Sequence, residues 1–412
     1  MGGCLRLALF ALSALLVACN GDDTYRVDYE GIPGQATALE LDGWVPVVQT
    51  RVNGGSPFTA LVDTGSPLTA FSPAALPGVS KGEVALRVEA FGLAFPDLRS
   101  VVVELFEESD LCQPARPRGL VGGDLLRGFR LGLDYRGERI FLFDGDVPDA
   151  TPVGEDTDAA VEVPVRVAGG GAAKLEGLAS PVNVGATRVL VAEAEVEGAR
   201  RAAVVDTGAS LTVLSSKLFD ALGGADRPVL CCESVATLYG IQDARITRLK
   251  ELRLGQAAVR NLPVLIWDNQ AFFDSISAEV GREVSMLIGG SFLRRFAVEI
   301  DYREGQLLLH RYREQDHVDA DEFVGPGFTL CQAKQAAEGM VVVDVYQGSS
   351  AEKAGVKRGE NLIMVDGQAI AGKTLAEIHA LLDKPQGTTL DLIFAGYVKR
   401  SVTVERLLSD YD

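Results

Sequence analysis

Short stretches of apolar residues recur along this chain, and turn-forming residues separate them. In residues 161–167 (VEVPVRV) apolar and polar positions alternate, which indicates a strand with one buried face. Two further apolar runs, residues 59–62 and 202–205, each follow a segment with a tight turn, residues 52–58 and 196–201. Each of these pairs of segments predicts a β-hairpin, so the pattern favours a mainly β protein.

The second strand of each predicted hairpin ends in the same tripeptide. The copies are Asp63-Thr64-Gly65 and Asp206-Thr207-Gly208, 143 residues apart. A second pair of matching segments, residues 119–129 and 286–296, lies 167 residues apart. The matching order continues in an Asp-Tyr-Arg segment, at residues 134–136 and 301–303. This preserved order indicates a duplicated unit, whose second copy is 24 residues longer between its two motifs.

A carboxyl group at the end of a buried strand is costly, and its duplication suggests that the two carboxyls meet. Two acids in one site can share a proton and act together on a water. One takes a proton from the water while the other donates to the carbonyl oxygen of an amide, without a metal or a covalent nucleophile. A single Asp-Thr-Gly would more often mark a turn. The repeat favours a catalytic pair that works at acidic to near-neutral pH.

These motifs resemble those of the pepsin and retropepsin group of aspartic proteases, in which each of two β-lobes gives one Asp to a water-activating dyad. The resemblance covers residues 40–312 and is closer to the bacterial retropepsin-like branch than to pepsin. It implies a double-lobed acid-protease β-barrel fold. It also implies that residues 120–122 and 287–289 pack beneath the active-site loops. The site residues that it implies are the dyad Asp63 and Asp206, the loop-locking Thr64 and Thr207, and Gly65 and Gly208, where backbone approaches closely.

Proteases of this group cover the active site with a β-hairpin, the flap. In the second lobe we expect residues 235–246 (VATLYGIQDARI) to form it, with Tyr239 and Gly240 at the tip. Tyr239 is equally compatible with an ordinary strand aromatic. We expect residues 84–95 of the first lobe to correspond to it, in a copy that is 24 residues shorter between its two motifs. We therefore expect unequal cover of the cleft, and a protein that kept the fold but lost substrate access is the alternative.

Residues 324–407 resemble a PDZ domain. Its characteristic segments occur in the family's order, at residues 325–330, 339–345, 348–360 and 365–368. The resemblance implies a loop whose backbone N–H groups receive a peptide's terminal carboxylate, formed by Gly325, Pro326, Gly327 and Phe328. The strand from Phe328 and the helix at residues 374–382 would bound the groove. Because Pro326 has no N–H to donate, a structural or cleft-shielding role is as compatible as tail binding.

The first residues predict the compartment. Arg6 precedes an apolar run, residues 7–18, with the length of a signal-peptide core and too short to cross a bilayer. Residues 16–19 (LVAC) resemble the lipobox of bacterial lipoproteins, in which cleavage before Cys19 leaves that cysteine lipidated. Asn20 follows, rather than the Asp that often retains such proteins at the inner membrane. We expect an anchor in the outer membrane, facing the periplasm; a cysteine there by chance is the alternative.

Composition agrees with a secreted globular protein. The 412 residues are 47% hydrophobic, enough for several packed domains. A net charge of −18 argues against nucleic acid as a partner. The three histidines form no Cys-His cluster with metal-site spacing, so we expect no metal or cofactor. Cys112, Cys231, Cys232 and Cys331 could form disulfides in an oxidising compartment. A bond from Cys112 to Cys231 or Cys232 would join the lobes, and buried free thiols are equally compatible.

The chain thus divides into seven predicted segments. They are a signal peptide (1–18), a lipidated tether (19–39), lobe 1 (40–150), an inter-lobe segment (151–194), lobe 2 (195–312), a linker (313–323) and a PDZ domain (324–407). We expect an aspartic endopeptidase that cleaves protein or peptide substrates and uses its PDZ domain to recruit or position them. The alternatives are an inert lipoprotein that acts as a PDZ peptide-binding scaffold and a structural lipoprotein that uses the double lobe as an interaction surface. An inert scaffold has no physical need for two facing carboxyls.

Overall fold

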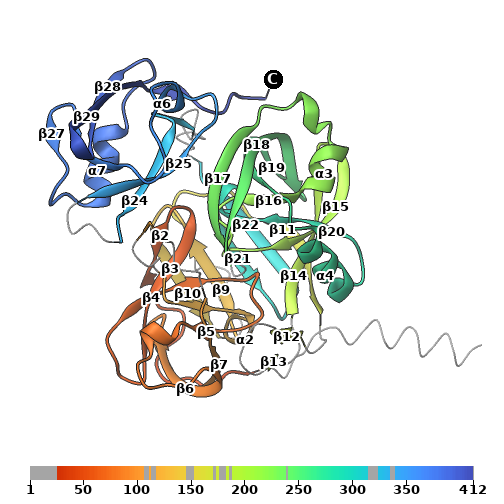
Figure 1. The fold of residues 1–412 in the computed structure, drawn as a ribbon. Coiled ribbons are helices and arrows are strands. Elements are labelled where there is room, and N and C mark those ends of the chain that lie inside the picture. The colour runs from red at the N-terminus through yellow and green to blue at the C-terminus, as the bar shows by residue number, and fades with distance from the viewer. Residues whose placement is uncertain are drawn as a thin grey trace, which may run out of the picture.

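A computed structural model shows two β-lobes and a smaller C-terminal domain (Figure 1). It describes residues 26–105, 111–112, 117–144, 153–169, 173–175, 182–184, 188–237, 240–313, 323–334 and 339–411. The predicted signal segment and Cys19 lie outside the described residues, as does Tyr239. In Figure 1 lobe 1 is red to orange, lobe 2 is mainly green and the C-terminal domain is blue.

Lobe 1 is built mainly on a seven-stranded sheet in the order β2-β3-β4-β8-β5-β7-β6. Its first hairpin turns at Asn53 and Gly54, whose φ angles of 49° and 69° are typical of the tight turn that joins two twisted strands. The elements are β1 (Thr37–Ala38), β2 (Glu40–Asp42), β3 (Val45–Val52), β4 (Phe58–Val62), β5 (Ala70–Phe71), η1 (Pro73–Ala75), β6 (Gly82–Ala90), β7 (Leu93–Val102), β8 (Gly119–Val121), α2 (Gly123–Leu126), β9 (Arg130–Asp134) and β10 (Arg139–Phe143).

Lobe 2 repeats this plan, and its first hairpin turns at Glu197 and Gly198 with φ angles of 49° and 85°. The strand β14 begins inside the predicted inter-lobe segment. The elements from that segment onward are β11 (Val161–Gly169), β12 (Ala173–Leu175), β13 (Val182–Val184), β14 (Arg188–Val196), β15 (Ala199–Val205), β16 (Thr212–Ser215), α3 (Ser216–Ala221), η2 (Gly224–Asp226), β17 (Leu230–Thr237), β18 (Gly240–Leu254), β19 (Ala257–Trp267), α4 (Gln270–Val280), β20 (Val284–Ile288), α5 (Gly290–Leu293), β21 (Phe296–Asp301) and β22 (Gln306–Arg311).

Strand pairing shows which hairpins of the two lobes correspond. β3 pairs with β6, with Arg51 opposite Glu89, and β14 pairs with β18, with Glu195 opposite Arg253. The β6–β7 hairpin is therefore the counterpart of β18–β19. The expectation that residues 84–95 correspond to residues 235–246 is wrong, because the strand register places residues 84–95 in the β6–β7 hairpin and residues 235–246 in β17 and β18.

Lobe 1 has no counterpart of β17 in the connection between β5 and β6. β5 ends at Phe71 and β6 begins at Gly82, whereas β16 ends at Ser215 and β18 begins at Gly240. This difference in length accounts for most of the 24 extra residues of the second copy. The hairpin formed by β17 and β18 is thus a feature of lobe 2 alone among the described residues.

One sheet joins the lobes. β9 of lobe 1 pairs antiparallel with β21 of lobe 2, with Asp134 opposite Ala297. The predicted strand at residues 161–167 is confirmed as β11, which pairs with β22 and with β14 in this sheet. A hydrophobic core continues through both lobes, with Phe71, Leu126 and Phe292 almost fully buried. The shared sheet and core hold the two Asp-Thr-Gly loops in one rigid frame.

The C-terminal domain has a core of its own around Val342, Leu362 and Phe394. Its helix α7 begins after Thr374, whose side chain forms a reciprocal capping pair with Glu377. The sheet order is β24-β25-β26-β28-β29. The elements are β23 (Val324–Gly325), β24 (Phe328–Gln332), β25 (Met340–Val345), α6 (Ser350–Lys353), β26 (Asn361–Val365), β27 (Gln368–Ala369), α7 (Leu375–Leu382), β28 (Thr389–Phe394), η3 (Ala395–Tyr397), β29 (Val398–Thr403) and β30 (Glu405–Arg406).

One disulfide attaches the C-terminal domain to lobe 1, and none joins lobe 1 to lobe 2 among the described residues. Cys112 is bonded to Cys331, with the two Cα atoms 5.7 Å apart, and Cys231 is bonded to Cys232. The pairing of Cys112 with Cys231 or Cys232 is therefore wrong, and none of the four is a free thiol. The physical reason is the position of the C-terminal domain, which brings Cys331 of β24 next to Cys112.

Candidate active site

The two Asp-Thr-Gly loops begin where β4 and β15 end. β4 pairs in parallel with β8, and β15 pairs in parallel with β20, so each loop follows a central strand. The backbone N–H of Asp63 donates to the carbonyl of Val121 (3.0 Å), and that of Asp206 donates to the carbonyl of Ile288 (3.0 Å). The repeated apolar segments noted in the sequence thus form the strands that support both loops.

Thr64 and Thr207 lock the two loops together. The Thr64 hydroxyl donates to the carbonyl of Val205 (2.9 Å), and the Thr207 hydroxyl donates to the carbonyl of Val62 (2.5 Å). Each hydroxyl oxygen also accepts from the backbone N–H of the opposite threonine, at 3.1 Å in both directions. Both threonines are almost completely buried. Four hydrogen bonds therefore cross between the lobes at this point.

Gly65 and Gly208 permit the approach of the opposite carboxyl group. A Cβ added to Gly208 would lie 2.5 Å from Cγ of Asp63, and one added to Gly65 would overlap the carboxyl of Asp206. No ordinary side chain fits at either position. The lack of a Cβ at both positions thus lets each loop lie against the carboxyl of the other lobe, and this brings Asp63 and Asp206 together.

The surroundings of the two carboxyls differ. Asp63 Oδ1 accepts from the backbone N–H groups of Gly65 and Ser66, both at 2.9 Å, whereas Asp206 Oδ1 accepts from Gly208 (2.9 Å). Burial raises the pKa of Asp63, against the lowering effect of its backbone donors. Burial, then the negative charge of Asp63, raise the pKa of Asp206 well above its usual range. The two carboxyls therefore titrate as a pair that shares one proton.

A half-buried carboxyl that the sequence did not single out supports the first loop. Asp124 accepts from both the hydroxyl (2.7 Å) and the N–H (2.9 Å) of Thr69, whose hydroxyl oxygen accepts from the N–H of Gly122 (3.2 Å). In lobe 2, Ser291 takes the place of Asp124 and accepts from the N–H of Thr212 (2.9 Å). Burial raises the pKa of Asp124 to about 6. The signal was present, because the repeated block reads Gly-Gly-Asp in one copy and Gly-Gly-Ser in the other.

The predicted flap residues are only partly described. Tyr239 lies outside the described residues, so its position at a hairpin tip stays a prediction. Gly240 is the first residue of β18 and pairs with Thr237 of β17, next to the turn of that hairpin.

The predicted carboxylate-binding loop connects β23 to β24. Gly325 ends β23 and Phe328 begins β24, with Pro326 and Gly327 between them. Gly327 has a φ of 93°, a backbone conformation that favours glycine, and its carbonyl accepts from the N–H of Tyr346 (2.9 Å). The loop is therefore fixed at the edge of the sheet, with Pro326 contributing no N–H.

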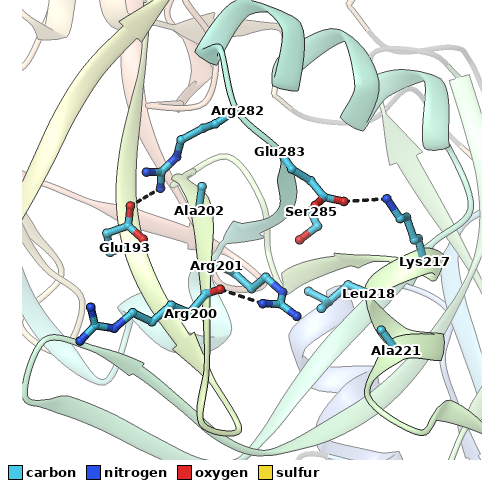
Figure 2. Close-up of a pocket in the computed structure, with 10 residues that line it drawn as sticks. All are labelled: Glu193, Arg200, Arg201, Ala202, Lys217, Leu218, Ala221, Arg282, Glu283 and Ser285. Carbon is cyan, nitrogen blue, oxygen red and sulfur yellow. Dashed lines mark hydrogen bonds and ion pairs between the residues drawn. The ribbon is translucent and has the colours of Figure 1, made fainter.

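A charged cavity on lobe 2 lies apart from the two Asp-Thr-Gly loops. It measures about 430 Å³ and is lined from β15, α3 and β20 (Figure 2). Cations and carboxylates pair across it: Lys217 with Glu283 at 2.7 Å, and Arg282 with Glu193. Neither Asp63 nor Asp206 lines it. In the described part of the chain no cluster of His, Cys, Asp or Glu could hold a metal. No helix described there is long and apolar enough to span a membrane.

Comparison with known proteins gives two family matches. Residues 192–292 match the aspartyl protease family, and residues 341–395 match the PDZ domain family. A comparison with curated proteins gives no match. Among solved structures, the aspartic proteinase from Irpex lacteus is similar, with 14% sequence identity and a TM-score of 0.42, over 68% of this chain and 98% of that chain.

This chain therefore combines a lobe pair of the aspartyl protease type with a PDZ domain. The resemblance to retropepsin-like and pepsin-like proteases, and the double-lobed β fold followed by a PDZ domain, are confirmed. The aspartyl protease match covers lobe 2 only. Lobe 1 resembles lobe 2 in its strand plan. The contacts between Thr64 and Thr207 pair the Asp-Thr-Gly loop of lobe 1 with that of lobe 2.

Proposed function

We propose that this protein is an aspartic endopeptidase in which Asp63 and Asp206 activate a water for hydrolysis of a peptide bond. The observation that carries the proposal is the reciprocal packing of the two loops, in which each glycine faces the carboxyl of the other lobe. Two raised and mutually dependent carboxyl pKa values in one site are what this chemistry needs. The match of lobe 2 to the aspartyl protease family supports the same class of reaction.

The unequal surroundings suggest different roles for the two acids. Asp63 has two backbone donors on one oxygen and is the better position for the negative charge, so it takes the proton from the water. Asp206 holds the shared proton and donates it to the carbonyl oxygen of the scissile amide. Because the two groups titrate as a pair, activity rises as the first proton leaves and falls as the second leaves. A bell-shaped pH profile follows.

The PDZ domain is proposed to recruit or position protein substrates, through binding of peptide segments. Its attachment next to the β17–β18 hairpin supports a role close to the protease lobes: the N–H of Gln347 donates to the carbonyl of Cys231 (2.9 Å). We further propose that Cys19 carries a lipid anchor that holds the protein at the outer membrane, facing the periplasm. This part rests on the sequence around Cys19 alone.

The test compares the wild type with Asp63→Asn, Asp206→Asn and the double variant, on a peptide library at several pH values. Each dyad variant should lose at least 10³-fold in kcat/KM, and the double variant should lose no more than either single, because the two groups act as a unit. Asp268→Asn, at an exposed carboxylate of lobe 2 (65% exposed), is the matched control and should retain full activity. Cleavage that survives either dyad substitution would exclude the proposed mechanism.

A further inference from the structure

The strand β24 has one paired edge and one outer edge, and the backbone direction along it can be assigned. It lies at the end of the sheet order, with β25 as its neighbour. The carbonyl of Gly327 accepts from Tyr346 (2.9 Å), and the N–H of Ala333 donates to Gly339 (3.2 Å), so odd-numbered residues face β25. Backbone groups alternate along a strand. Phe328, Leu330 and the other even-numbered residues therefore face the outer edge.

The irregularity in this pairing does not change the assignment. Phe328 lies opposite Val345 and Leu330 lies opposite Val342, so the extra residue belongs to β25 and the alternation of β24 is intact. The outer edge of β24 thus presents unbroken backbone groups from Phe328 onward. It starts at the loop that ends in Gly327, where a PDZ domain is expected to receive a peptide.

A segment of lobe 1 already occupies the far end of this edge. The N–H of Lys334, an even-numbered residue, donates to the carbonyl of Leu111 (2.8 Å). Cys112 pairs antiparallel with Ala333, and its side chain is bonded to Cys331. We call Leu111 and Cys112 the strap. A backbone pairing, which includes this hydrogen bond, and a covalent bond thus hold the strap where a long peptide would continue.

We propose that the strap closes the distal part of the PDZ groove, so that the open edge takes only the terminal residues of a partner chain with a free carboxyl group. Among the described residues only β25 pairs with Phe328 to Cys331, so their outer edge has room for about four residues of an antiparallel strand. Longer extended segments would meet Cys112, which already pairs with Ala333. This restriction rests on the peptide-binding role proposed for the PDZ domain, but not on the dyad.

The disulfide makes the closure conditional. Without it, the strap is held by non-covalent contacts, among them the backbone hydrogen bond from Lys334 to Leu111. A peptide strand that forms several bonds along the edge can then displace the strap. The groove is short while Cys112 and Cys331 are bonded and becomes longer when they are reduced.

The test uses the full chain with Asp63→Asn and Asp206→Asn, so that binding is measured without cleavage and independently of the proposed protease activity. The strongest binder from a library of random decapeptides with free carboxyl ends is remade with four residues, with ten, and with ten and a terminal amide. Four-residue and ten-residue forms should bind within twofold of each other, and the amide at least tenfold more weakly. Equal binding of the amide, a ten-residue form at least fivefold tighter, or no binder at all would overturn the proposal.

A second comparison tests the strap directly. Adding Cys112→Ser with Cys331→Ser should make the ten-residue form bind at least fivefold tighter while leaving the four-residue form unchanged. The matched control, Cys231→Ser with Cys232→Ser, removes the other disulfide and should leave the length dependence as it was. Hydrogen exchange should show the Lys334 amide protected in the bonded protein and exposed in the Cys112→Ser/Cys331→Ser chain. A Lys334 amide that exchanges freely in the bonded protein would show that no strap is formed.

Discussion

Asp344 of the PDZ domain accepts two hydrogen bonds from Ser234 of the protease lobe. Ser234 donates from its hydroxyl to Oδ1 (2.6 Å) and from its N–H to Oδ2 (3.2 Å). Asp344 Oδ2 also accepts from the hydroxyl of Thr329 in β24, at 3.1 Å. Next to this contact the Tyr346 hydroxyl donates to Glu233 (3.0 Å). The strand that borders the PDZ groove and the outer strand of the β17–β18 hairpin therefore share one buried carboxylate.

Asp344→Ala should loosen the PDZ domain from the protease lobes. The variant leaves the donors of Ser234 and Thr329 without their acceptor, at a cost of about 2–3 kcal/mol because the lost bonds go to a charged group. Hydrogen exchange at Ser234 and its neighbours in β17 should become faster. Asp391→Ala, which removes an exposed carboxylate bonded to Ser401, is the control and should leave β17 unchanged. Unaltered hydrogen exchange in β17 after Asp344→Ala would show that other contacts are enough to hold the PDZ domain against the protease lobes.

Thr64→Val and Thr207→Val should each destabilise the protein and impair catalysis. Either substitution removes a hydroxyl that donates to one buried carbonyl and accepts from one buried N–H of the other lobe. We expect a loss of about 2–4 kcal/mol in the free energy of unfolding, from denaturant titration, because buried partners stay unsatisfied. Thr64→Ser keeps the hydroxyl and should lose much less. Equal stability of the Val and Ser variants would contradict this role.

Asp124 should make the stability of the protein fall between about pH 4 and pH 6. Its pKa in the folded chain is raised to about 6, whereas an unfolded Asp ionises near 3.9, so the folded state binds the extra proton and is favoured at low pH. The contribution lost as the pH rises through this window is roughly 3 kcal/mol. Asp124→Asn cannot ionise and should flatten this part of the profile. The measurement is urea unfolding at intervals from pH 3.5 to 7. If the free energy of unfolding of Asp124→Asn changed with pH as steeply as that of the wild type, this prediction would be refuted.

Tyr135→Phe and Tyr302→Phe should leave stability unchanged or raise it by up to about 1 kcal/mol. Both hydroxyls, from the repeated Asp-Tyr-Arg segments, are buried without a hydrogen-bond partner in the described structure, and an unpaired buried hydroxyl is unfavourable. Tyr312→Phe is the contrasting control, because its hydroxyl donates to Asp134 (2.9 Å) and its loss should cost about 1–2 kcal/mol. Thermal unfolding separates the cases. A large loss of stability in Tyr135→Phe would show that the Tyr135 hydroxyl has a hydrogen-bond partner.

Cys19→Ser should release the protein from membranes if the lipobox interpretation is right. Cells that express the wild type and are fed labelled palmitate should show label in this protein, and the variant should show none. Cys112→Ser, at a cysteine that the structure places in a disulfide, is the control and should keep the label. Label that persists in Cys19→Ser would exclude this residue as the attachment site.

The strand plan of the lobes and the order of the domains followed from local patterns in the sequence. The Asp-Thr-Gly loops could be recognised because each needs a strand, a buried donor and a glycine within a few residues, and these requirements are local. The role of Asp124 could not be predicted, because it depends on hydrogen bonds from Thr69, which lies 55 positions earlier in the sequence. The difference between the two copies at Asp124 and Ser291 was visible, but its meaning was not.

By itself, the sequence determined that two similar lobes are present, that each carries one Asp-Thr-Gly loop, and that a PDZ domain follows. Only the tertiary structure decided that lobe 1 has no counterpart of β17, because this depends on the register of β6 against β3. It also decided that Cys112 meets Cys331, across 219 residues of sequence. The physical reason is the range of the interactions. Turn and strand preferences act between neighbours, whereas strand register and disulfide pairing depend on how distant elements pack.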